Sequence, residues 1–292
     1  MQNWLFPKLQ APEDDGVLKI IILGSSRSVN TFQLLYEAFK DQMPDQEFVM
    51  GVMYYSGCSM TMHENFIKTN QPVYSFYHND NGRWVITPGK YMHEGLLAEN
   101  WDAVLLQAGS GDLNKQMQLE TRKFLKSYID DYVIDPYELW WHSTWFNSTD
   151  PVLYKPPKTA ADAAKVDQIK QLTQTNDAAK TYVLNDPMFA GHITSGTPMM
   201  YALKVLDVPE VDLFRDHTHL SDFGCLLVAF SFYAQYTGKP VTQINLDTIP
   251  IHLRHKEYQH LGDMTVTDEM KQIIIDTVAY TMDNPWSVPT GD

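Results

Sequence analysis

The sequence predicts an α/β protein, a three-layer α/β/α sandwich whose central sheet is mostly parallel and flavodoxin-like in its layering. Two observations favour this class. Short apolar runs rich in β-branched residues are typical of strands that are buried on both faces, and they alternate with segments whose apolar residues recur at helical spacing. The chain has 292 residues, of which 44% are hydrophobic, which is enough for one large core.

The expected strands are apolar runs bounded by turn residues. The clearest is Leu18 to Leu23, which reads Leu-Lys-Ile-Ile-Ile-Leu and runs into a glycine. The other runs of this kind are residues 48–54, 103–107, 137–142 and 190–194. Residues 73–89 instead hold aromatic pieces on both sides of an Asn-Gly pair at 81–82, which predicts a β-hairpin.

The expected helices fill the intervals between the strands. Phe32, Leu35, Tyr36 and Phe39 recur at helical spacing and predict a helix over 29–42. The same pattern predicts helices at residues 63–70, 91–99, 113–132, 160–174, 198–206, 220–236 and 267–282. We see no linker that would divide the chain. We therefore expect an irregular N-terminal arm over 1–17 and a single domain over 18–292, with a small insertion near 73–89.

Composition excludes several classes of partner. The formal net charge is -14, from 36 acidic and 22 basic residues, which argues against nucleic acid and against anionic membranes. No run is apolar enough for a transmembrane helix. The first residues lack the pattern of a signal peptide, which leaves the compartment open: we expect a periplasmic or secreted protein if a signal has been removed, and a cytoplasmic one otherwise. Cys58 and Cys225 are expected to be buried thiols, and the sequence predicts no oligomeric state.

Polar and small residues gather where the predicted strands end. In open α/β sheets, ligands bind beyond the carboxyl ends of the strands. Those ends carry Gly24-Ser25-Ser26, Gly57, Gln107 and His142, and Asp216 and His219 lie together near the end of the chain. A hydroxyl, backbone donors, an imidazole and a carboxylate are the groups that an acyl-transfer site needs.

Five stretches resemble a known family. They are Gly24 to Ser28, Gly57-Cys58-Ser59, Trp101 to Ala108, Trp141 to Trp145, and Arg215 to Ser221. Together they resemble the SGNH (GDSL-type) hydrolases, and within them a bacterial branch catalogued as a domain of unknown function. The likeness spans about residues 18 to 238, and the Arg-Asp-x-x-His-Leu-Ser stretch is its most specific part. The resemblance implies the three-layer fold and a Ser-His-Asp triad.

The resemblance assigns the nucleophile to Ser26. A serine hydroxyl attacks well only when a neighbouring base removes its proton, and a turn between strand and helix exposes it. Ser25 is the rival, at a position where the wider family has Asp and this branch often has Asn. A structural turn serine is the alternative. Arg27 departs from the branch's usual apolar residue, and we expect it to contact an anionic substrate or intermediate, or else to pair with a surface acid.

His219 is the expected general base, and Asp216 the acid that orients it. Their spacing of three residues lets one turn present both side chains. Two alternatives stay open. Asp216 or Thr218 could instead cap the apolar helix that follows. His217, His219 and Asp216 could instead bind a metal ion, although no distant motif supplies further ligands, so we expect neither a metal nor a cofactor.

The expected oxyanion hole consists of the backbone N–H groups of Ser26 and Gly57 and the side-chain amide of Gln107. The wider family uses an Asn after the third strand. Here the corresponding stretch, residues 109–112, reads Gly-Ser-Gly-Asp and lacks it. Gln107 is therefore the best side-chain candidate, with the backbone of 109–111 as the alternative donor and a polar strand end as the structural alternative.

The aromatic stretch Trp140 to Trp145 is the expected substrate wall, with His142 and Trp145 as binding residues, although core packing is the alternative. The hypothesis is a serine esterase that acts through an acyl-serine intermediate. It removes a small acyl group from a carbohydrate or another small molecule, and the family resemblance suggests that this group is acetyl. Two rivals remain: an idle module of the same fold that binds a glycan, and a metal-dependent hydrolase.

Overall fold

A central sheet organises the molecule. The computed structural model describes residues 15–80, 82–108, 116–134, 136–163 and 165–291. Within these residues the main sheet has seven strands in the order β4-β3-β2-β1-β5-β6-β7. The parallel strands are β1 (Val17–Gly24), β2 (Glu47–Tyr54), β5 (Ala103–Ala108), β6 (Glu138–Ser143) and β7 (Gly191–Thr194). All five expected parallel strands are thus present.

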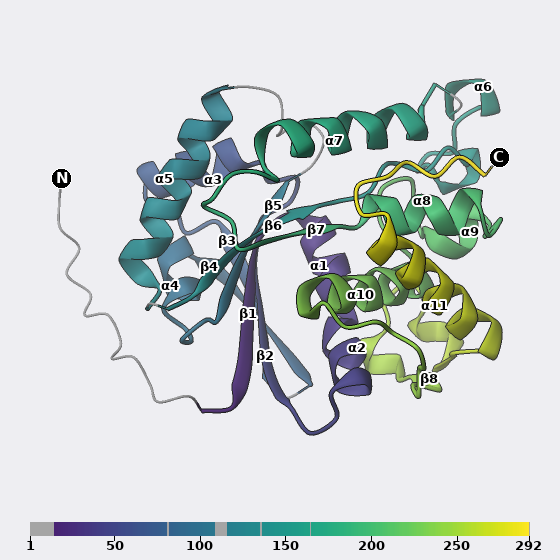
Figure 1. Cartoon of the computed structure of the whole chain (residues 1–292), viewed down its shortest axis with the longest axis horizontal. Coiled ribbons are helices and arrows are strands. Elements are labelled where there is room, and N and C mark those ends of the chain that lie inside the picture. Colours follow the sequence, from purple (N-terminus) through teal and green to yellow (C-terminus); the bar gives the residue numbers. More distant parts are fainter. Residues whose placement is uncertain (1–14, 81, 109–115, 135, 164, 292) are drawn as a thin grey trace.

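Helices cover both faces of this sheet (Figure 1). One face packs against α1 (Ser26–Gln33), α2 (Leu35–Gln42), α8 (Gly196–Lys204), α10 (Asp222–Thr237) and α11 (Asp268–Asp283). The other packs against α3 (Met60–Lys68), α4 (Met92–Leu96), α5 (Gln116–Tyr132) and much of α7 (Gln168–Tyr182). The side chains of Ile20, Ile21 and Ile22 alternate between these two layers and are fully buried. This is the three-layer α/β/α sandwich that the sequence predicts.

Two expected helices are each divided into two. The helix expected over 29–42 breaks at Leu34, whose φ of -117° and ψ of 12° are not helical. Phe32 of α1 and Phe39 of α2 both contact Phe232 of α10. The helix expected over 160–174 is α6 (Ala160–Ala163) followed by α7, which begins at an Asp167 N-cap.

The aromatic hairpin is part of the main sheet. Strands β3 (Tyr74–Asp80) and β4 (Arg83–Lys90) form it, and β3 pairs antiparallel with β2. The register pairs Tyr77 with Val52 on one side and with Ile86 on the other, and it pairs Trp84 with Asn79. Because side chains alternate between faces, Tyr77, Trp84 and Ile86 share one face of the sheet.

The second half of the chain contains short elements that the periodicity of the sequence did not predict. These are α9 (Glu210–Leu213), three 3-10 helices (Pro151–Leu153, Ile251–Leu253 and Gln259–Leu261) and a small sheet of β8 (Thr248–Ile249) and β9 (Met264–Thr265). No helix in the described part of the chain is long and apolar enough to cross a membrane.

Candidate active site

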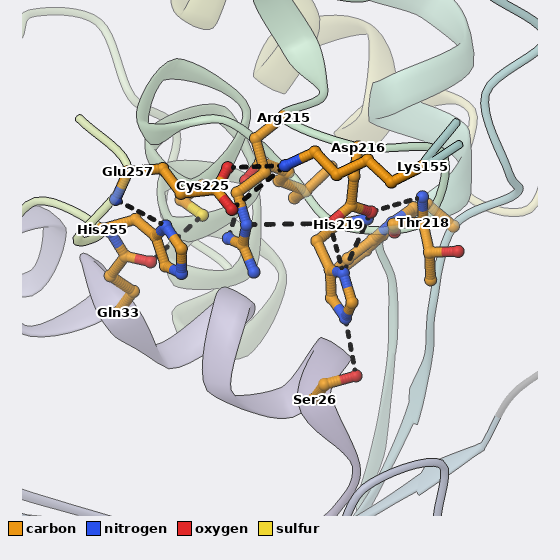
Figure 2. A network of polar contacts seen from close by, with 12 residues as sticks. Ser26, Gln33, Lys155, Arg215, Asp216, Thr218, His219, Cys225, His255 and Glu257 are labelled. Atoms are coloured by element: carbon orange, nitrogen blue, oxygen red, sulfur yellow. Dashed lines mark hydrogen bonds and ion pairs between the residues drawn. The ribbon is translucent and has the colours of Figure 1, made fainter. Parts of the chain in front are cut away.

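Ser26 is the first residue of α1, directly beyond the carboxyl end of β1. Helix N-terminal N–H groups have no acceptor within the helix, so the N–H of Ser26 is available to a ligand. The Ser26 Oγ lies 2.9 Å from Nε2 of His219 (Figure 2). Ser25, the rival, is the N-cap of α1, and its buried hydroxyl lies 2.7 Å from Oε1 of Gln107. The structure therefore brings Ser26, and not Ser25, to the imidazole.

Asp216 and His219 occupy one tight turn before α10. The Asp216 carboxylate accepts from Nδ1 of His219 at 2.8 Å and from the backbone N–H groups of Thr218 and His219 at 2.9 and 2.8 Å. The N-cap of α10 is Ser221, whose Oγ accepts from the N–H of Gly224. The capping alternative for Asp216 and Thr218 is thus wrong.

The surroundings of Asp216 keep its carboxylate ionised. Burial by itself would raise the pKa of Asp216, but the hydrogen bonds from His219 and the two backbone N–H groups outweigh it and hold the pKa well below its usual range. An ionised carboxylate can only accept, so Nδ1 of a neutral His219 carries the hydrogen. Nε2 is then the atom that can accept the proton of Ser26 Oγ.

Gln107 is held as a hydrogen-bond acceptor, whereas the expected role was that of a donor to the oxyanion. Its buried Oε1 accepts from the backbone N–H of Ser25 at 2.8 Å and from the hydroxyls of Ser25 and Ser28 at 2.7 Å each. Because a backbone N–H must donate, the carbonyl of the amide is the group that faces this turn. Gln107 therefore fastens the segment that carries Ser26.

Gly24 makes this fastening sterically feasible. A Cβ built on Gly24 would lie 2.0 Å from Oγ of Ser28 and 2.7 Å from Oε1 of Gln107. Any larger residue would displace the amide or the serine from its place. The small residue before the two serines is thus explained by close approach.

Arg27 does not line the cleft, contrary to the expectation that it contacts the substrate. Its Nη1 donates to the carbonyl of Trp145 and, at 3.1 Å, to Oγ1 of Thr144, and its Nη2 donates to Oδ1 of Asn147 at 2.6 Å. The guanidinium also lies over the Trp145 ring, 5.6 Å from its centroid. Burial lowers the pKa of Arg27 to about 10, which leaves it cationic at neutral pH. Arg27 thus ties α1 to the segment after β6.

Trp145 continues this connection toward the base. Its ring is buried, and its Nε1 donates to the carbonyl of Thr218 at 2.8 Å, one residue before His219. Arg27 follows the nucleophile and Thr218 precedes the base, so Trp145 joins the two halves of the site. The expectation that Trp145 binds substrate is therefore corrected to a positioning role.

His142 is also a structural residue. It is fully buried, its Nε2 lies 2.8 Å from Oγ of Ser195, and burial lowers its pKa to about 3. None of its surface is exposed and it is not among the residues that line the cleft beside Ser26, so its expected role in substrate binding is wrong. Helices cover both faces of the sheet at this part of β6.

Gly57 lies in the loop that follows β2, and β2 is the strand that pairs with β1. It is exposed, its φ of +62° suits glycine, and no described residue accepts a hydrogen bond from its N–H. The N–H of Tyr55 in the same loop donates to the carbonyl of Gly24 at 3.2 Å, which keeps the two strand ends together. The alternative donors at 109–111 lie outside the described residues.

The histidine beside the base points elsewhere. The His217 ring stacks on Tyr154, with centroids 4.7 Å apart and an angle of 15° between planes. Among the described residues, no group of three or more His, Cys, Asp and Glu side chains is arranged to hold a metal ion. Cys58 and Cys225 are buried thiols, as expected.

A cleft of about 630 Å³ opens beside Ser26 and His219. One wall is apolar and comes from Tyr54, Tyr77, Trp84 and Ile86. These residues were not among the predicted site residues. The signal was available in the alternation of the hairpin, because residues 77, 84 and 86 share one face once the Asn-Gly turn fixes the register.

The comparisons with known proteins concern the fold. No family model matches the chain, and no curated protein is significantly similar to it. A solved DUF4886 family protein from Bacteroides uniformis has a TM-score of 0.72 and 21% identity, covering 94% of this chain and 97% of its own. A gut microbial diltiazem-metabolizing enzyme, 11% identical with a TM-score of 0.43, matches 80% of this chain and 50% of that enzyme. The first likeness shows a shared fold, and the second is too low to support an argument.

Proposed function

We propose that the protein is a serine esterase that hydrolyses a small acyl ester. One observation carries the proposal: Asp216, His219 and Ser26 form a continuous hydrogen-bonded chain of 2.8 and 2.9 Å that ends at a cleft. Nucleophile, base and orienting acid in this order are the arrangement for acyl transfer through serine. Acetyl is the acyl group we favour, and the family resemblance alone suggests it.

The reaction has two halves. Ser26 Oγ bonds to the acyl carbon while its proton passes to Nε2 of His219, and the negative oxygen that forms is held by the N–H groups of Ser26 and Gly57. The bond to the alcohol oxygen then breaks, and His219 returns the proton to that oxygen. Water next attacks the acyl-serine while its proton passes to His219. The bond between the acyl carbon and Ser26 Oγ then breaks, His219 returns the proton to Oγ, and the acid leaves.

The first experiment is covalent labelling. A fluorophosphonate should add a single label to the protein, and peptide mapping should locate it on Ser26. Ser26→Ala should neither label nor turn over p-nitrophenyl acetate, with kcat lower by about 10⁴- to 10⁶-fold, as triad removal usually gives. Thermal unfolding of the variant controls for its fold.

Three results would contradict the proposal. A label on Ser25 would move the nucleophile. A well-folded protein that neither labels nor hydrolyses acetyl, butyryl or octanoyl esters would favour an idle binding module. Activity that a chelator removes and a metal ion restores would favour a metal-dependent hydrolase.

A further inference from the structure

A second set of the residues that line the cleft is basic. This basic wall contains Arg215 and the segment His252 to Lys256, which includes Arg254 and His255. None of the described residues that line this cleft is Asp or Glu. The contrast is informative because the chain has a net charge of -14, and because the neighbouring groove along α9 and α11 is lined by four acids, Asp207, Asp212, Asp222 and Glu269.

The acids nearest this wall are already bound by other groups. Asp222 is buried and accepts from Nε of Arg254 at 2.8 Å. Glu257 pairs with Lys155 at 3.1 Å, and Asp216 is held by His219. Asp222 thus neutralises Arg254, which leaves Arg215, His255 and Lys256 as the donors of this wall.

Three donors remain available on the cleft side. Lys256 is exposed and has no ion-pair partner among the described residues. His255 Nδ1 accepts from the N–H of Glu257, so a neutral His255 carries its hydrogen on Nε2. Arg215 uses Nη1 for the carbonyl of Leu220, its Nε lies 3.9 Å from the Asp216 carboxylate, and its guanidinium lies between His219 and His255 (Figure 2).

We propose that the substrate of this site is an anionic ring-bearing ester: its ring lies against Tyr77, Trp84 and Ile86, and a carboxylate or another oxyanion group lies at Arg215, His255 and Lys256. This inference rests on the proposed esterase function. A cleft with one apolar wall and one wall that carries the cations Arg215 and Lys256 and the donor His255 suits a molecule with one apolar face and one negative charge. Such a wall also raises the local concentration of anions in a protein that otherwise repels them.

The test compares two esters that differ by one charge. 4-Acetoxybenzoate is anionic, and its methyl ester is neutral. After correction for their rates of hydrolysis without protein, kcat/KM should be about ten-fold higher for the anion, mainly through KM, and 0.5 M salt should remove most of the preference. An equal rate, or a preference for the neutral ester, overturns the inference.

Matched variants locate the effect. Lys256→Glu should reduce the preference for the anion about ten-fold. Lys239→Glu makes the same change of charge at another exposed lysine. Lys239 lies just after α10. Tyr236 near the end of that helix packs on Trp140 in the first half of β6, so this end of α10 is near the amino ends of the parallel strands and away from the site. Lys239→Glu should leave the preference intact, and equal effects of the two variants would overturn the assignment.

The ring wall has its own pair of variants on one strand. Ile86 is 54% exposed and lines the cleft, whereas Val85 is 49% exposed and faces the opposite side. Ile86→Ser should raise KM for both esters several-fold, about the effect of losing one apolar contact, and Val85→Ser should not. A KM that both variants leave unchanged contradicts the placement of the ring.

A failure of the esterase proposal would be distinguishable. If the folded protein hydrolyses neither ester, calorimetry with 4-hydroxybenzoate and 4-hydroxybenzamide tests the basic wall alone. Tighter binding of the anion that Lys256→Glu abolishes supports the wall as an anion site, and equal binding of the two compounds overturns it.

Discussion

The connection through Trp145 makes a measurable prediction about catalysis. Trp145→Phe keeps an aromatic ring but removes the Nε1 that donates to the Thr218 carbonyl at 2.8 Å. A half-buried carbonyl without its donor costs about 1–2 kcal/mol, and the void left by the smaller ring adds about 1 kcal/mol. We therefore expect the free energy of unfolding to fall by about 2–3 kcal/mol.

The effect on turnover should exceed what stability explains. Thr218 directly precedes His219, so a carbonyl that moves shifts the imidazole relative to Ser26. A misplacement of about 1 Å can cost about 10²-fold in rate. We expect kcat for p-nitrophenyl acetate to fall by about 10- to 100-fold while KM changes little. Steady-state kinetics well below the unfolding transition separates this effect from partial unfolding.

Trp140→Phe is the matched control. Trp140 lies on β6, five residues before Trp145, and its Nε1 also donates a hydrogen bond of 2.8 Å, to Oε2 of Glu138 at the start of the strand. The substitution removes the same atoms and one hydrogen bond but touches nothing near His219. Equal losses of kcat in the two variants, or a Trp145→Phe enzyme with reduced stability and normal kcat, would refute the positioning role.

Two further predictions follow from buried groups. Gln107→Glu keeps an acceptor for Ser25 and Ser28 and should retain more kcat than Gln107→Leu, whereas the opposite order in kinetics would indicate a donor to the oxyanion. Burial lowers the pKa of His63 to about 4 and that of His142 to about 3. Unfolding then takes up protons below about pH 6.5, so stability should fall on acidification from pH 7 to 4, by up to about 3 kcal/mol per histidine. Denaturant titrations of His63→Gln should show a shallower pH slope, and an unchanged slope contradicts the assignment.

The order of the elements could be predicted because local pattern and global fold agree there. Leu18 to Leu23 reads as a buried parallel strand and is one, with Ile20 to Ile22 fully buried. Helix breaks could not be predicted, since the pattern of Phe32 to Phe39 fits one helix as well as two. The packing of both phenylalanines on Phe232 of α10 joins residues about 200 positions apart, and tertiary contacts of this kind are not visible in a local pattern.

The meeting of Ser26 with His219 could be predicted from the strand end that carries Ser26 together with the family resemblance, but the roles of their sequence neighbours could not. Successive residues on a helix point about 100° apart. When Ser26 faces His219, Arg27 must therefore face another direction, and it meets Asn147 and the Trp145 carbonyl instead. Adjacency to a nucleophile on a helix thus indicates a residue that fixes the helix more often than one that touches the substrate.

The same geometry explains why the aromatic wall comes from the hairpin. In the middle of a sheet covered on both faces, the odd-numbered and the even-numbered side chains of a strand both point into a helical layer. Alternation near Trp140 to Trp145 therefore could not expose a binding surface. Trp141 on β6 and Trp145 just after it are buried on different sides of the sheet. The edge strand β4 is mostly exposed, and there Trp84 and Ile86 border the cleft. A binding wall in a fold of this class is therefore best sought in edge strands whose alternation leaves apolar residues without a covering helix.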